Sequence, residues 1–108
     1  MESEVKKILS TLDVPVAHLR YKGSSKTYVT WTMLDEEPSF ASDDEITKSE
    51  VNLDIDIYSE SNYLNILSSI KDKMKENDWI WNGDSSEMYE DETGLYHRTC
   101  SFKKEREI

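Results

Sequence analysis

The stretch V-N-L-D-I-D-I-Y-S, residues 51–59, alternates apolar and polar side chains without a break. Strict alternation predicts a β-strand that turns one face to a core and the other to water. The apolar set is Val51, Leu53, Ile55 and Ile57. In this register the carboxylates of Asp54 and Asp56 share the opposite face with Glu50.

Two amphipathic segments are predicted as helices that cover the apolar face of this strand. In residues 61–77 the apolar side chains recur at helical spacing: Tyr63, Leu64, Leu67, Ile70 and Met74. Residues 3–12 show the same spacing in a shorter segment, with Val5, Ile8, Leu9 and Leu12 on one face. We expect the longer helix to pack directly on residues 51–57.

The remaining segments complete an α+β fold. Residues 16–21 and 27–33 are predicted to form a hairpin, and further strands are predicted over 79–81 and 95–103. Residues 35–46 are acidic and contain a proline, and they are predicted to be a long exposed loop. The order α-β-β-β-α-β-β predicts a mostly antiparallel sheet of four to five strands with two helices packed on it, in a single domain over residues 1–108.

Composition excludes several classes of protein. The chain has 108 residues and a net charge of −10, from 23 acids and 13 bases. So acidic a chain is not expected to bind nucleic acid specifically or to lie on a membrane, because both partners select basic surfaces. Leu, Ile, Val and Phe together supply only 23 residues, so the core is thin. The single Cys100 excludes an internal disulfide and a multi-cysteine zinc site, and it fits synthesis in a reducing compartment.

No group of residues in the sequence predicts catalysis, a metal or a cofactor. His97 and Cys100 are three residues apart on a predicted strand, so they face opposite sides and cannot pair. The acids Asp43, Asp44 and Glu45 lack the glycine-punctuated spacing of a calcium loop, with or without the strand aspartates. Glycine-rich phosphate loops are also absent. The residues therefore favour a non-enzymatic binding or assembly module.

Charge is segregated between two neighbouring segments. Residues 14–34 contain three bases and no acid, whereas residues 35–60 contain ten acids and one base. Adjacent segments of opposite sign suit a head-to-tail self-association, although a solvated loop beside an ordinary turn has the same composition. The candidate interface residues are Arg20, Lys22, Lys26, Phe40, Asp43, Asp44 and Glu45.

Several stretches, taken in order, resemble one family. They are V-P-V-A-H-L-R-Y-K-G-S-S-K-T-Y-V-T-W (14–31), D-D-E-I (43–46), the alternating strand 51–59, a helix closing on Met74, and Y-E-D-E-T-G-L-Y-H-R (89–98). The last is close to the family pattern Y-E-x-D-T-G-x-Y-H-K. Over residues 8–104 the chain resembles the tail terminator proteins, also called tail completion or tail-to-head joining proteins, of long-tailed phages and prophages of Gram-positive bacteria. It departs from them by Trp79 and Trp81 and by extra acids at 35–37.

The resemblance implies a structural virion protein without catalytic residues or cofactors. Such proteins form a ring, typically hexameric, that ends tail-tube polymerisation and docks the tail to the head connector. The implied partners are further copies of the chain, the major tail tube protein and the head–tail connector proteins, and DNA passes through the ring without specific binding. The implied location is the head–tail junction of the virion, after assembly in the host cytoplasm.

Two questions stay open at this point. Glu50, Asp54 and Asp56 are candidates to line the hole of the ring, where acids would repel DNA, but the loop acids 43–45 are a second candidate lining. Both sets could equally be outer surface. The chain could also be a small acidic regulatory or inhibitor protein that binds a basic partner, and a ring in solution would distinguish the first function from the second.

Overall fold

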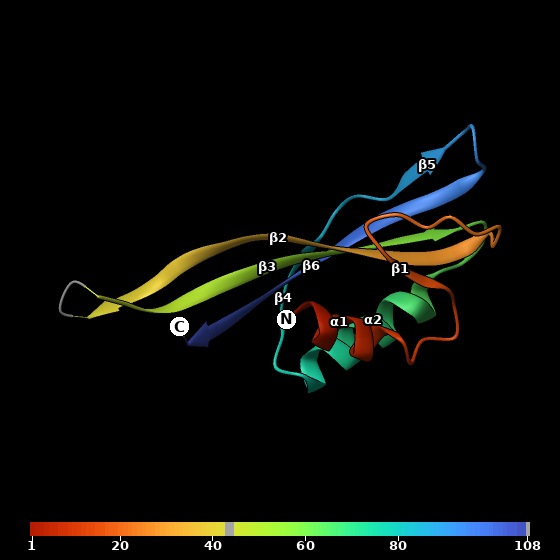
Figure 1. Cartoon of the computed structure of the whole chain (residues 1–108). Helices are drawn as coiled ribbons and strands as arrows, with labels where there is room; N and C mark the ends of the chain where they lie inside the picture. The colour runs from red at the N-terminus through yellow and green to blue at the C-terminus, as the bar shows by residue number, and fades with distance from the viewer. Residues whose placement is uncertain (43–44, 108) are drawn as a thin grey trace.

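The computed structural model describes residues 1–42 and 45–107, with the side chains of 40–42 outside that description. It is an α+β fold with two helices and a six-stranded, mostly antiparallel mixed sheet (Figure 1). The elements are α1 (Glu2–Leu9), β1 (Val16–His18), β2 (Thr27–Ser42), β3 (Glu45–Ser59), α2 (Leu64–Glu76), β4 (Ile80–Asp84), β5 (Met88–Glu90) and β6 (Leu95–Glu107). The strand order is β1-β2-β3-β6-β4, and β5 pairs with β6.

The predicted class and core are confirmed. Both helices lie on one face of the sheet (Figure 1), and the four apolar residues of 51–57 are buried beneath them. Leu67, Ile70 and Met74 of α2 are buried too, but Leu64 is exposed, contrary to prediction. At about 100° per residue, Leu64 lies roughly a quarter turn away from the centre of the buried stripe, where Tyr63 takes its place.

The predicted loop over 35–46 is wrong. β2 continues to Ser42 and β3 begins at Glu45, and the two strands pair antiparallel along their whole length. Residues 34–42 and 45–50, here called the arm, extend away from the helix-covered part of the molecule, here called the body (Figure 1). The arm makes the protein long, with extents of 53 × 25 × 23 Å.

The predicted hairpin over 16–33 is also wrong. β1 pairs with β2 in parallel, with Val16 opposite Val29 and His18 opposite Trp31. The connection 19–26 carries the chain back to the level where β1 begins, so that β2 runs in the same direction as β1. It begins at Leu19, which lies in the left-handed region at φ 66°. Tyr21 folds this connection back, because its hydroxyl accepts a hydrogen bond from the Ser25 N–H and its ring stacks on Tyr28.

The C-terminal third contains three strands where two were predicted, so the sheet has six strands rather than the predicted four to five. β5 lies in the acidic stretch 84–93, and it forms a hairpin with β6, which runs to Glu107 rather than 103. The turn depends on Gly94 at φ 72°, whose N–H donates to the Glu90 carbonyl. Within the described residues, neither helix is long and apolar enough to cross a membrane.

Candidate functional site

The arm buries no apolar side chain among its described residues. Leu34 and Ile46 are 53% and 50% exposed. The described side chains of the arm carry five acids, Asp35, Glu36, Glu37, Glu45 and Glu50, and one base, Lys48. Since β1 pairs with β2 only over 29–31, the arm portion of β2 has no neighbouring strand on its outer side among the described residues. Pro38 and three register shifts interrupt that edge, which are features that discourage unspecific strand pairing.

Ion pairs to β6 hold the base of the arm, Lys48 with Glu105 and Glu36 with Arg106. Arg106 of β6 donates from Nε and Nη2 to the two carboxylate oxygens of Glu36, at 2.8 Å each, and Ser49 donates to the same carboxylate. These hydrogen bonds, from Arg106 first and then Ser49, lower the pKa of Glu36. The arm therefore leaves the body in a fixed direction, although no core supports it.

An apolar groove lies on the helix-covered side of the sheet, along the edge strand β4 and away from the free edge of β2 in the arm. It has a volume of about 490 Å³ and is lined by Lys71, Asp72, Lys75, Trp79, Ile80, Trp81 and Phe102. Trp79 and Phe102 are buried, whereas Ile80 and Trp81 are 57% and 53% exposed. We call this the Trp81 groove. It combines exposed apolar surface with two lysines and one aspartate.

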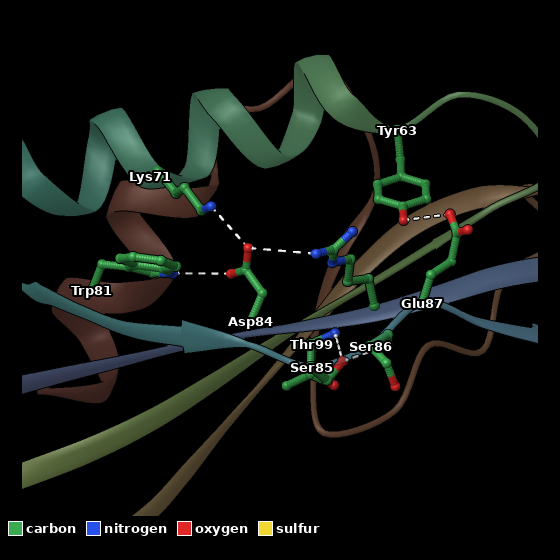
Figure 2. Close-up of polar contacts among 9 residues, drawn as sticks. Tyr63, Lys71, Trp81, Asp84, Ser85, Ser86, Glu87 and Thr99 are labelled. Carbon is green, nitrogen blue, oxygen red and sulfur yellow. Dashed lines mark hydrogen bonds and ion pairs between the residues drawn. The ribbon is translucent and has the colours of Figure 1, made fainter.

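Asp84 fixes the wall of the Trp81 groove (Figure 2). Its carboxylate accepts hydrogen bonds from Lys71 Nζ at 2.8 Å and from Trp81 Nε1 at 3.0 Å, and Arg98 Nη2 lies 4.0 Å away. Lys71 Nζ also lies 4.6 Å from the centre of the Trp81 ring. Burial by itself would raise the pKa of Asp84, but the hydrogen bonds from Lys71, Cys100 and Trp81 outweigh it and lower the pKa. The exposed indole is thus held in one orientation.

A second set of polar contacts ties the chain after β4 to the body. Tyr63 donates to Glu87 at 2.5 Å, and the Thr99 N–H donates to Ser85 Oγ at 2.9 Å (Figure 2). Burial first, and then the hydrogen bond to Glu87, raises the pKa of Tyr63. The connection 85–87 between β4 and β5 is therefore held by side-chain hydrogen bonds together with a backbone bond from the Ser85 N–H to the Thr99 carbonyl.

The face of the sheet away from the helices carries a ladder of stacked rings. Tyr28 stacks on Tyr21 and on Tyr58, and Tyr58 stacks on His97, with ring centres 4.4, 4.8 and 4.2 Å apart in that order. Burial first, with Asp56 next, raises the pKa of Tyr58 to about 12. We call this surface the open face. Its rings support one another across the strands.

The predicted lumen residues Glu50, Asp54 and Asp56 all lie on the open face, but they are only partly exposed. The Asp56 carboxylate lies 2.9 Å from His97 Nε2 and accepts a hydrogen bond from Thr99 at 2.5 Å. Asp54 accepts one from Ser101 at 2.7 Å. The expectation of a freely hydrated face is therefore wrong for Asp56, which holds β3 to β6.

The predicted interface residues do not come together within one chain. Arg20, Lys22 and Lys26 lie in the connection between β1 and β2, at the end of the molecule opposite the arm (Figure 1). Arg20 shares a hollow with Glu90. Glu45 is exposed at the start of β3. Asp43, Asp44 and the Phe40 side chain lie outside the described residues, although the Phe40 backbone pairs with Lys48 in the arm.

His97 and Cys100 lie on opposite faces of β6, as their spacing predicts. Cys100 is fully buried, and burial raises the pKa of its thiol far above the usual range, which suppresses the nucleophilic thiolate. Among residues 1–42 and 45–107, no group of three or more His, Cys, Asp or Glu side chains is placed to hold a metal ion.

The sequence pattern did not predict the Trp81 groove. The stretch W-I-W (79–81) predicts a short strand, and alternation alone does not say which tryptophan is buried. The signal that could have found the groove is the second tryptophan, three residues before Asp84, since a carboxylate at that distance can hold an indole N–H.

The segment 89–98 has a structural explanation at several positions. Tyr89 and Tyr96 face each other across the β5–β6 hairpin at 5.1 Å between ring centres, and Thr93 donates to Glu90 in the turn. His97 contacts Asp56.

The chain matches no protein-family model, and no curated protein matches it.

Proposed function

We propose that this chain is a ring-forming tail terminator, a structural protein that ends polymerisation of a phage tail tube and docks the tail to the head connector. The arm is the observation that carries the proposal. It leaves the body, buries no apolar side chain among those that the structure describes, and presents Leu34 and Ile46 to solvent. A segment of this kind contributes little to folding, and it is suited to contacting a neighbouring subunit.

The distribution of charge supports the same function. Residues 34–47 carry six acids and no base, with one base, Lys48, directly after them, while the body carries positive groups in the 19–26 connection and beside the Trp81 groove. Unlike surfaces on different parts of one chain favour a head-to-tail contact, which closes into a ring when the rotation between copies permits. The resemblance of residues 8–104 to tail terminators adds the biological setting of that ring.

The open face is our proposed lining of the hole. It carries Glu50 and Asp54 beside Glu37 and Glu105, and acids at a lumen repel the phosphates of passing DNA. Glu50→Lys with Asp54→Lys should leave particles assembled but slow DNA ejection, most strongly at low salt. Glu60→Lys with Glu76→Lys, at two exposed acids that line neither the open face nor the Trp81 groove, is the control. Normal ejection from assembled Glu50→Lys/Asp54→Lys particles would place these acids on the outer surface.

The main experiment is to image the protein and measure its sedimentation at high concentration, alone and with purified tail tubes. Terminators of this type can stay monomeric until a tube tip templates the ring, so both conditions are needed. The proposal predicts rings in solution or at tube tips. A protein that remains monomeric or dimeric in both conditions, while tubes grow to unregulated length in its presence, contradicts it.

The open face also favours one alternative function. Its partly exposed acids could cover a basic site on another protein, as a regulatory or inhibitor protein does. This function predicts a monomer or dimer that binds a basic protein with strong salt dependence, with the arm dispensable. The imaging experiment separates the two, because an inhibitor has no reason to form rings.

A further inference from the structure

We propose that the Trp81 groove is the seat for the arm of a neighbouring copy of this chain. The inference rests on the proposed function, because it names the two surfaces that meet in the ring. Nothing in the fold of a single chain explains the groove: among its lining residues none comes from the arm or from any other covering segment of the described chain. Its exposed wall is apolar, and its orientation is fixed.

The groove has the construction of an interaction hot spot. Trp81 is held from behind by Asp84 and Lys71, and more than half of its surface remains exposed. An immobilised indole loses little conformational entropy on binding, and tryptophan is enriched among residues that dominate interfaces. The Asp84 side chain is only 10% exposed, so its ion pair with Lys71 keeps the indole in place and Asp84 does not itself contact the partner.

The arm matches the groove in both of its chemical features. Leu34 and Ile46, which are exposed apolar side chains in the described part of the arm, correspond to the exposed Ile80 and Trp81. The acids of the arm correspond to the exposed Lys75 at the rim of the groove, whereas Lys71 is already paired with Asp84. The basic 19–26 connection offers charge without an equivalent apolar wall, since Leu19 is its one strongly exposed apolar residue and Arg20 already lies beside Glu90.

The placement of the two surfaces suits a contact between copies rather than within one chain. The free edge of the arm belongs to β2, and the groove lies along β4 at the other edge of the sheet. β3 and β6 separate these strands, which amounts to about 14 Å at the usual strand spacing. A contact between opposite edges is heterologous: each copy uses its arm on one neighbour and its groove on the other, which is the arrangement that closes into rings.

Cysteine cross-linking between copies tests the pairing. Leu34→Cys and Ile80→Cys proteins are mixed in equal amounts, with tail tubes where the ring requires them, and oxidised. The native Cys100 is fully buried and stays out of the reaction. We expect disulfide-linked dimers at least ten times more abundant than in a mixture of Leu34→Cys with Leu64→Cys, a position as exposed as Ile80. The chain carrying both substitutions should give a ladder that ends in a closed ring.

The outcomes separate this inference from the proposed function. Rings with no selective Leu34–Ile80 cross-link, or with a selective cross-link from Leu34→Cys to Leu19→Cys, overturn the groove as the seat and leave the ring intact. Absence of both rings and cross-links overturns both proposals. A selective cross-link to a tube protein, instead of to a second copy, also overturns the inference, because the occupant would then be different.

A second variant keeps the inference testable without new cysteines. Trp81→Ala should reduce ring formation at least tenfold while the unfolding midpoint stays close to that of the parent protein. Tyr89→Ala removes an aromatic side chain of similar exposure on the β5–β6 hairpin, and it should leave ring formation unchanged. Equal ring formation by Trp81→Ala and the parent protein would overturn the assignment.

Discussion

The body and the arm are continuous in two strands but differ in what stabilises them. In the body, Leu53, Ile55 and Ile57 of β3 are completely or almost completely buried under the helices. In the arm, residues 45–48 of the same strand are exposed or half-exposed. The ladder to β2 holds them, together with the pairing of Lys48 to Glu107 of β6 and the Lys48–Glu105 ion pair. One strand thus contains a folding element and, on our proposal, an assembly element.

The largest expected effect contrasts two isoleucines of β3. Ile55→Ala should lower the free energy of unfolding by about 2–4 kcal/mol, because it opens a cavity in the core. Ile46→Ala should lower it by less than about 0.5 kcal/mol, since Ile46 is half-exposed in the arm. Urea denaturation followed by circular dichroism measures both. Equal losses would mean that the arm is part of the folding unit, and the contrast between the two regions would be lost.

A smaller loss is expected at the ion pair that holds the Trp81 groove. Asp84→Asn removes the charge from a nearly buried carboxylate and should cost about 1–3 kcal/mol. Because the pKa of Asp84 is lowered in the folded protein, this stabilisation is present above its ordinary value of 3.8 and is lost as the pH falls below it. The difference between parent and variant should therefore shrink as the pH falls below 3.8, measured by the same denaturation assay. Asp72→Asn, at an exposed position of the groove, is the control and should change the free energy of unfolding by less than about 0.5 kcal/mol at any pH. A stability difference between the parent protein and Asp84→Asn that does not change with pH would contradict the account.

The smallest expected effect is local to the base of the arm. Glu36→Gln weakens the bidentate contact with Arg106, yet both side chains are well exposed, so the unfolding midpoint should not move measurably. Amide hydrogen exchange of β2 and β3 in the arm should become several-fold faster, while exchange in the body stays the same. Faster exchange in the body would show that the cluster supports the core as well.

The sequence predicted the body much better than the arm, for a physical reason. Residues 51–57 alternate because one face of that segment is buried, and this pattern located the core strand. Residues 35–39 and 45–46 are exposed whichever face they lie on, so their pairing leaves no apolar alternation, and the acids and Pro38 of 35–46 resemble a loop. Pairing there comes from the backbone ladder and from Glu36, Ser49 and Arg106, which are distant in sequence.

The candidate sites divide in the same way. That His97 and Cys100 cannot pair followed from strand periodicity alone. The role of Asp56, which holds β3 to β6, could not be predicted without the cross-strand register. The Trp81 groove could not be predicted without knowing that Trp79 is buried and Trp81 is exposed. The parallel pairing of β1 depends on a reversal at Leu19, and leucine gives no local signal for a positive φ.

The central claim is that the arm serves assembly rather than folding. It is tested most directly by measuring ring formation and the unfolding midpoint of one protein, Leu34→Ser with Ile46→Ser, beside a Leu64→Ser control of equal exposure on α2. Mass photometry at matched concentrations, with tail tubes where the parent protein requires them, reports the rings, and thermal denaturation reports the midpoint. The account predicts that the arm variant keeps the parent midpoint and loses its rings, while the control keeps both. Rings formed normally by the arm variant, or an arm variant that unfolds well below the control, would contradict it.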